Sequence, residues 1–136
     1  MTLNNGLRIL TDPAFAEKSG LDLAAQAEEL GVDFVAAWYE PESAILAHIV
    51  ARALGTAVVS AENSEGIIEL LEPVAAGGHG LLVANSFNRT NSVRGLIGAI
   101  ANAGSTVAGI AVLTRSAALD EAEADLPVFA VSDDRQ

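Results

Sequence analysis

A cluster of polar side chains follows an apolar run in the second half of the chain, and its residue types suit the binding of an anion. Arg89 supplies a cation, and the hydroxyls of Thr90 and Ser92 can donate hydrogen bonds to an anionic oxygen. A helical pattern starts at Val93, and a helix N-terminus favours an anion because its first N–H groups lack partners within the helix. The same residue types also cap helices without any ligand, so the sequence leaves both readings open. The segment, called the anion loop below, comprises Asn88, Arg89, Thr90, Asn91 and Ser92.

Acidic and aromatic residues follow an earlier apolar run and form a second polar segment. Glu40 and Glu42 could act as a metal-binding or acid/base pair, although acidic residues also suit the first turn of a helix. Trp38 and Tyr39, the only tryptophan and tyrosine of the chain, could stack on a base or anchor a dimer. For these two, packing in the core or at an interface is the reading that we favour. The segment, called the acidic loop below, comprises Tyr39, Glu40, Glu42 and Ser43.

The overall charge argues against several classes of partner. The 136 residues carry a formal net charge of −11, and such a surface repels the phosphates of nucleic acids and of anionic lipids. It also disfavours polyanionic small molecules, unless an arginine or a metal ion offsets the field locally. We therefore expect no nucleic-acid partner and no membrane partner, and the charge opposes a nucleic-acid-binding regulator in particular.

Several chemistries are excluded or disfavoured by what the chain lacks. It contains no cysteine, which excludes disulfides, thiolate catalysis and cysteine metal sites. His48 and His79 have no third ligand nearby in the sequence, so we expect no metal site. No nucleophile motif or Walker loop is recognisable. The glycine-rich segment Gly77-Gly-His-Gly80 precedes a strand, whereas a dinucleotide-binding fingerprint follows one, so dinucleotide binding is not indicated either. With no signal-peptide pattern and no run of about 20 apolar residues, we expect a cytoplasmic protein.

Short apolar runs alternate with helical patterns along the chain. The strands and helices that this alternation predicts must hold both loops in position. The alternation predicts an α/β fold, a doubly wound parallel sheet flanked by helices, in a single domain over residues 1–136. Segment 62–80 reads as a long excursion with a helical or hairpin piece around Ile67 to Leu71. Ligands of such sheets bind beyond the carboxyl ends of the strands, so the segments to inspect are Trp38 to Ser43, Ala61 to Asn63, Ala84 to Ser92 and Thr114 to Ser116. We expect strands at 33–39, 56–60, 81–84, 107–113 and 128–131. Glycines close the helical patterns at Gly31, Gly55 and Gly104.

A longer pattern connects these pieces. It opens with Gly80-Leu-Leu-Val-Ala-Asn-Ser-Phe-Asn-Arg-Thr-Asn-Ser92, passes through a helix to Ala103-Gly104 and ends in the strand Val107-Ala-Gly-Ile-Ala-Val-Leu113. Upstream, Trp38-Tyr-Glu-Pro-Glu-Ser43 leads into a helix, and downstream Leu126-Pro127-Val128 leads into a last strand. In order and spacing, residues 33 to 131 resemble the type I phosphoribosyltransferases, and most closely the xanthine and adenine phosphoribosyltransferases.

The resemblance implies a chemistry and a set of site residues. Members of the family transfer ribose 5-phosphate from phosphoribosyl pyrophosphate to a nitrogenous base with magnesium. Two acidic residues hold the ribose hydroxyls, and a loop of small residues binds the 5′-phosphate. Here the acidic positions fall on Ala84 and Asn85, which carry no charge. The anion loop stands in place of the phosphate loop but lacks its usual glycines, and the acidic loop stands in place of the pyrophosphate loop.

These departures predict a phosphoribosyltransferase-like protein without ordinary transferase activity, and no catalytic residue is assigned. Such a protein would bind a phosphate-bearing metabolite or a protein partner, and it would need no cofactor. The alternative is an active purine-type enzyme that uses phosphoribosyl pyrophosphate and magnesium through Asn85 and the pair Glu40 and Glu42. The apolar surface of the helix from Glu42 to Leu54 and of Trp38 and Tyr39, together with the resemblance, predicts a homodimer with two-fold symmetry.

Overall fold

Helices and strands alternate along the chain. The computed structural model describes residues 5–117, 119 and 126–132. The helices of this part are α1 (Asn5–Thr11), α2 (Pro13–Ala27), α3 (Pro41–Leu54) and α4 (Val93–Asn102), with a 3-10 turn η1 at Glu28–Leu30. The strands are β1 (Phe34–Trp38), β2 (Ala57–Ser64), β3 (Ile67–Leu70), β4 (His79–Ala84), β5 (Thr106–Thr114) and β6 (Val128–Ser132).

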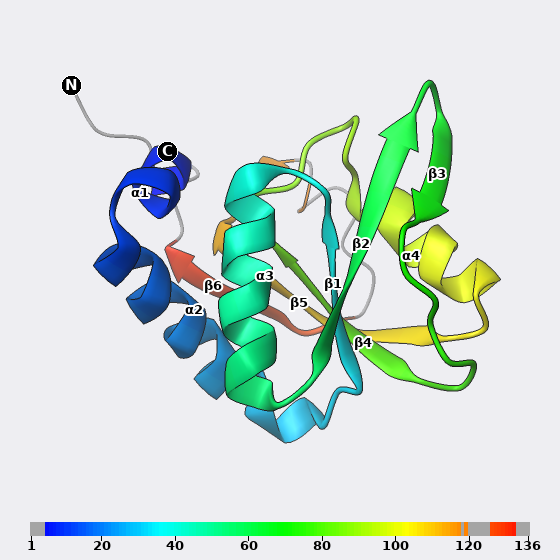
Figure 1. Cartoon of the computed structure of the whole chain (residues 1–136), viewed down its shortest axis with the longest axis horizontal. Coiled ribbons are helices and arrows are strands. Elements are labelled where there is room, and N and C mark those ends of the chain that lie inside the picture. Colours follow the sequence, from blue (N-terminus) through cyan, green and yellow to red (C-terminus); the bar gives the residue numbers. More distant parts are fainter. Residues whose placement is uncertain (1–4, 118, 120–125, 133–136) are drawn as a thin grey trace.

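The strands form one six-stranded sheet in the order β3-β2-β1-β4-β5-β6 (Figure 1). All neighbouring pairs are parallel except β2 and β3, which are antiparallel. Within the excursion expected at 62–80, the hairpin alternative is the one observed. There β2 runs on to Ser64, and the chain turns through Glu65 and Gly66 with φ of 53° and 89°. The predicted α/β fold with a parallel sheet is confirmed, and the hairpin adds its antiparallel edge strand.

Helices cover both faces of the sheet, as a doubly wound fold requires. Alternate residues of β4 point to opposite faces: Leu81 and Val83 belong to the hydrophobic cluster with α1, α2 and α3, whereas Leu82 and Ala84 belong to the cluster with α4. Figure 1 shows α2 and α3 on one side and α4 on the other. Among the described helices, none is long and apolar enough to cross a membrane.

Two glycines end helical segments as predicted. Gly31 follows η1 with φ of 61°, and Gly55 follows α3 with φ of 73°, which is the left-handed backbone that glycine adopts without strain. At its other end, α3 begins with Pro41, and only Tyr39 and Glu40 separate it from the end of β1 at Trp38. Because α3 then runs back along the sheet, its first turn stays at the carboxyl end of β1. The acidic loop is therefore held at the carboxyl ends of the strands.

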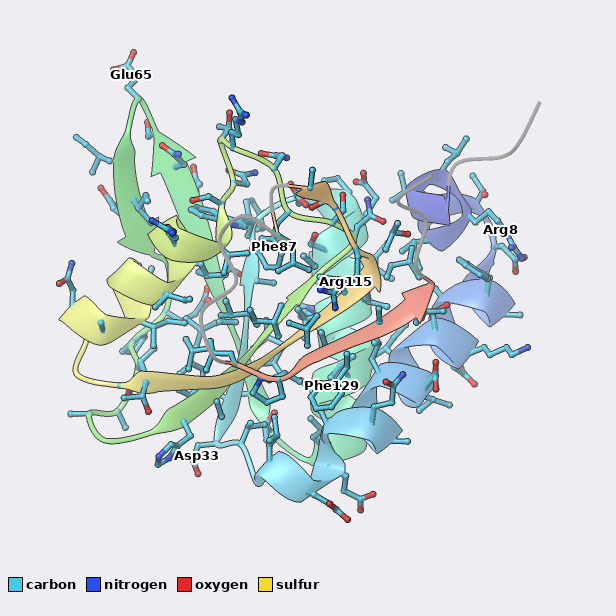
Figure 2. The ribbon with its side chains drawn as sticks, turned by 180° about the vertical axis from the view of Figure 1, so that it is seen from behind. Arg8, Asp33, Glu65, Phe87, Arg115 and Phe129 are labelled. Atoms are coloured by element: carbon cyan, nitrogen blue, oxygen red, sulfur yellow. The ribbon has the colours of Figure 1, made fainter. Side chains whose placement is uncertain are left out.

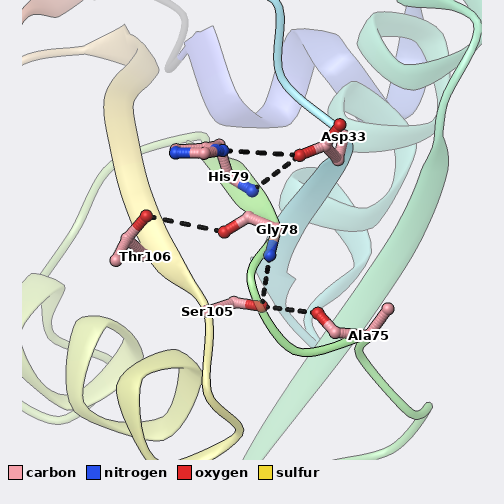
Figure 3. A network of polar contacts seen from close by, with 6 residues as sticks. All are labelled: Asp33, Ala75, Gly78, His79, Ser105 and Thr106. Carbon is pink, nitrogen blue, oxygen red and sulfur yellow. Dashed lines mark hydrogen bonds and ion pairs between the residues drawn. The ribbon is translucent and has the colours of Figure 1, made fainter.

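The glycine-rich segment before β4 is fixed by a polar network at the amino ends of the strands (Figure 3). The Asp33 carboxylate accepts a hydrogen bond from the backbone N–H of His79 (2.8 Å), and its Oδ2 lies 3.6 Å from His79 Nδ1. The Ser105 hydroxyl accepts from the N–H of Gly78 (3.3 Å) and donates to the carbonyl of Ala75 (2.7 Å). His79 thus lies at the amino ends of the strands, opposite to the carboxyl ends where a ligand site is expected.

Candidate functional site

The two polar loops predicted from the sequence lie at the carboxyl ends of the strands. Because β1 and β4 are parallel neighbours, Tyr39 after β1 and Asn85 after β4 emerge at the same edge. The end of β5 joins them, since the N–H of Thr114 donates to the carbonyl of Asn85 (3.0 Å). The Ser116 hydroxyl donates to the carbonyl of Phe87 (2.8 Å). The structure therefore brings the acidic loop and the anion loop together beyond the carboxyl ends of three strands.

The Glu40 carboxylate connects the two loops. Its Oε1 accepts a hydrogen bond from the Ser43 hydroxyl (2.6 Å), and its Oε2 accepts one from the Asn91 side-chain amide (3.1 Å). The Ser43 hydroxyl accepts in turn from the backbone N–H of Asn85 (3.1 Å), and Ser43 is completely buried. Hydrogen bonds to a charged acceptor are stronger than those between neutral groups. This network therefore fixes the spacing between the acidic loop and the anion loop.

Hydrogen bonds within the anion loop fix its shape. The side-chain oxygen of Asn88 accepts from the backbone N–H groups of Thr90 (3.0 Å) and Asn91 (2.7 Å). Ser92 is the N-cap residue of α4, and its hydroxyl accepts from the N–H of Gly95 (3.0 Å). The capping role therefore holds for Ser92. The turn at Asn88 also occupies two N–H groups that a phosphate could otherwise use.

Side chains of β1 and β2 hold the anion loop from outside. Trp38 Nε1 donates to the carbonyl of Ser92 (3.1 Å), and Asn63 Nδ2 donates to the carbonyl of Thr90 (3.0 Å). Trp38 is only 2% exposed, which confirms the packing role favoured from the sequence. Arg89 is exposed, and within the part of the chain that the structure describes its guanidinium has no hydrogen-bond or ion-pair partner. The cation of the loop is therefore available to a ligand.

The two positions where the resemblance expects acidic residues lie in different surroundings. Ala84 is 1% exposed and belongs to the same hydrophobic cluster as Trp38 and Phe87; Phe87 is labelled in Figure 2. The methyl group of Ala84 offers no polar contact. Asn85 is half-buried, and its backbone N–H and carbonyl are bonded to Ser43 and Thr114. Neither side chain carries a negative charge that could stabilise a developing cation.

The remaining residues of the acidic loop are not gathered around one point. The structure joins Glu40 to Ser43 and Asn91, whereas the Glu42 side chain makes no hydrogen bond or ion pair within the described residues. Tyr39 is 66% exposed. It lines a shallow depression of about 370 Å³ together with Glu40, Pro41, Ala44 and Ile45. Among the described residues, no group of three or more acidic, histidine or cysteine side chains could hold a metal ion.

Two further contributors come from strand-end segments that the sequence singles out for inspection, although it assigns neither residue a role. Asn63 supports the anion loop through Thr90, and Ser116 supports its start through Phe87. The one available signal was their position at the carboxyl ends of predicted strands, because polar residues there face the same edge. Arg115 beside Ser116 also lies at the end of β5, as Figure 2 shows.

Comparisons with solved structures show which known fold this chain shares. The adenine phosphoribosyltransferase of Thermoanaerobacter pseudethanolicus is 17% identical, with a TM-score of 0.76 over 92% of this chain and 83% of its own. This chain has the fold of the type I phosphoribosyltransferases. No model of a protein family matches the chain, and no curated protein sequence matches it either. The likeness therefore establishes the phosphoribosyltransferase fold and leaves the activity to be argued from the site.

Two further structures with this fold contain phosphate groups. The orotate phosphoribosyltransferase of Mycobacterium tuberculosis H37Rv, in complex with inorganic phosphate, is 21% identical, with a TM-score of 0.60 over 90% of this chain and 76% of its own. A hypothetical protein from Neisseria gonorrhoeae with bound ppGpp is 18% identical, with a TM-score of 0.66 over 90% of this chain and 81% of its own. The phosphoribosyltransferase fold is thus common to proteins that hold quite different phosphate compounds.

The burial of Ala84 can be tested by measuring how a charge at position 84 changes the free energy of unfolding. Ala84→Asp should lower the free energy of unfolding by roughly 3–5 kcal/mol at neutral pH, because it buries a charge in an apolar cluster without a partner. Asn85→Asp, at the half-buried neighbouring position, should change it by less than about 1 kcal/mol. Urea unfolding followed by circular dichroism measures both values. Equal stability of the two variants would show that position 84 is not part of the core.

Proposed function

We propose that the strand-end site binds a phosphate-bearing metabolite weakly and that the protein has no ordinary transferase activity. One observation carries the proposal: at this edge the cation of Arg89 is exposed and unpaired among the described residues, while the buried methyl of Ala84 stands where a transferase would need a carboxylate. The anion-binding part is therefore better preserved than the ribose-binding part. No cofactor is required by this function.

The likeness to solved structures supports the choice of ligand class. The orotate phosphoribosyltransferase neighbour contains inorganic phosphate and the Neisseria gonorrhoeae neighbour contains ppGpp. Both ligands carry phosphate groups that an exposed arginine and a nearby hydroxyl can contact. The net charge of −11 works against high affinity, so millimolar binding is the expected range.

The alternative function is that of an active purine-type phosphoribosyltransferase with an unusual site. The adenine phosphoribosyltransferases among the structural neighbours favour it. It would employ Asn85 with Glu40 and Glu42, and it would require magnesium and phosphoribosyl pyrophosphate. Against it, both oxygens of the Glu40 carboxylate already accept hydrogen bonds from the protein, which leaves Glu40 poorly placed to coordinate a metal.

Binding of phosphate can be followed directly at the anion loop. Inorganic phosphate without magnesium should shift the amide resonances of residues 88–93 in NMR titrations. Arg89→Ala should weaken this binding at least about tenfold, because it removes the charge that faces the ligand. Arg52→Ala is the matched control, since Arg52 is an exposed arginine in the last turn of α3 and away from the strand ends. If residues 88–93 do not respond at millimolar phosphate, the anion loop is a helix cap only.

The absence of transferase activity is a separate prediction. Loss of one well-placed electrostatic group commonly costs ~10²–10³ in rate, and both acidic positions are uncharged here. With phosphoribosyl pyrophosphate, magnesium and a panel of purine and pyrimidine bases, release of pyrophosphate should therefore stay near the uncatalysed rate. Turnover at ordinary enzymatic rates with any base would establish the alternative function instead.

We also propose that the protein pairs as a two-fold homodimer through the exposed side of α3. Tyr39 and Ile45, which are 66% and 37% exposed, both line the depression after β1 and form an apolar patch there. Burying such a patch against a second copy would remove it from water. Partners of this surface are accordingly expected to be copies of the same chain.

The dimer can be tested by sedimentation at micromolar concentration. Ile45→Glu should convert the dimer to a monomer, because it places a charge in the buried interface. Ile67→Glu is the control, since Ile67 is 63% exposed on the edge strand β3 and outside the patch. A purely monomeric wild-type protein, or a dimer that survives Ile45→Glu, would contradict the proposed interface.

A further inference from the structure

The Glu40 carboxylate is itself an anion at the strand-end site. It lies at the residue before α3, yet it does not cap that helix through its side chain. Both of its oxygens are directed to donors of other groups, the Ser43 hydroxyl at 2.6 Å and the Asn91 amide at 3.1 Å. One donor belongs to the acidic loop and the other to the anion loop. Glu40 therefore joins the two loops in the way that a bound ligand with two acceptor oxygens would join them.

The hydrogen-bond network extends this contact across three segments. The backbone N–H of Asn85 donates to the Ser43 hydroxyl, which donates to Glu40. Asn91, the other donor, has its own N–H bonded to Asn88. Asn63 and Trp38 hold the carbonyls of the same loop. With so many partners in place, the anion loop cannot turn Asn91 towards a ligand unless Glu40 releases it.

These contacts divide the anion loop into two sides. Arg89 and Thr90 are exposed and can face a ligand from solvent. The side towards α3 ends in the Asn91 amide, which is already paired with the Glu40 carboxylate. A single phosphate group can be bound on the Arg89 side. A second phosphate group that extends towards α3 would meet a like charge at close range, and its repulsion is weakly screened because Glu40 and Asn91 are half-buried.

We propose that Glu40 determines the specificity of the site by acting as an internal anion: the site accepts one phosphate group and excludes a diphosphate. The inference rests on the proposed function, since it assumes that phosphate is bound at the anion loop, and it narrows the ligand to a phosphomonoester or free phosphate. It also explains why an acidic residue is compatible with a site that binds anions, because the carboxylate occupies one half of it.

The test compares inorganic phosphate with pyrophosphate, both without magnesium, by calorimetry and amide NMR titration. The wild type should bind pyrophosphate no more tightly than phosphate. Glu40→Gln keeps the size of the side chain and removes its charge, so it should raise the affinity for pyrophosphate about tenfold and the affinity for phosphate less than about threefold. Glu62→Gln is the matched control. Glu62 is an exposed carboxylate on β2 beside Asn63, and its removal should change either affinity less than about threefold.

A second measurement does not depend on the ligand. The side-chain NH₂ resonances of Asn91 should shift in Glu40→Gln and remain in place in Glu62→Gln, because among the described residues Glu40 alone accepts from that amide. If these resonances are unchanged in Glu40→Gln, the contact on which the inference rests is absent and the inference is overturned.

The binding outcomes separate the inference from the proposed function. A ratio of pyrophosphate to phosphate affinity that rises equally in Glu40→Gln and Glu62→Gln would overturn the role of Glu40 while leaving phosphate binding intact. Tight pyrophosphate binding by the wild type would also overturn the role of Glu40 and leave phosphate binding intact. If only Glu40→Gln binds the two anions, Glu40 excludes both of them, so the proposed function of the wild type fails and the selectivity for a single phosphate group fails with it. If neither protein binds either anion, both proposals fail.

Discussion

The structure depends on the parallel pairing of β1 with β4 at the centre of the sheet. Phe34 of β1 stands opposite Gly80 of β4, and a Cβ atom on residue 80 would lie only 2.4 Å from the Phe34 ring. Glycine at this position lets the ring lie across β4, so that the two strands pair in this register. Both strands then end at the same edge, where the acidic loop and the anion loop meet. The site therefore follows from a packing contact at the opposite end of the same strand pair.

At the strand ends, the polar groups are satisfied by one another. A buried donor without a partner costs about 1–3 kcal/mol, and loops at the end of a parallel sheet contain many donors. Here Glu40, Asn88 and Ser92 supply acceptors for side-chain and backbone donors of the same region. The loops can therefore keep their shape without a ligand. The same hydrogen bonds occupy donors that a ligand could otherwise use.

Position 84 shows how packing and chemistry place opposite demands on one residue. The alternation of β4 directs residue 84 into the cluster beneath α4, where a small apolar side chain is stable. A carboxylate there would need a cation or a ligand to compensate its burial. Alanine meets the packing demand and supplies no charge. The phosphoribosyltransferase fold is thus compatible with a buried, uncharged residue at position 84, because the fold depends on the apolar pattern whereas function depends on individual side chains.

The sequence by itself determined the fold class and the position of both loops. Apolar runs and glycines such as Gly31 and Gly55 mark where elements begin and end, because these are properties of neighbouring residues. It also placed both loops at the same end of the sheet, because the strands of a parallel sheet have their carboxyl ends together. Only the tertiary structure decided which loop residues touch. Glu40 and Asn91 are 51 positions apart in the chain, and Asn63 and Thr90 are 27 apart. Hydrogen bonds over such separations require a strand register and side-chain directions that exist only in the folded chain, and so the internal anion of the site could not be read from the residue types alone.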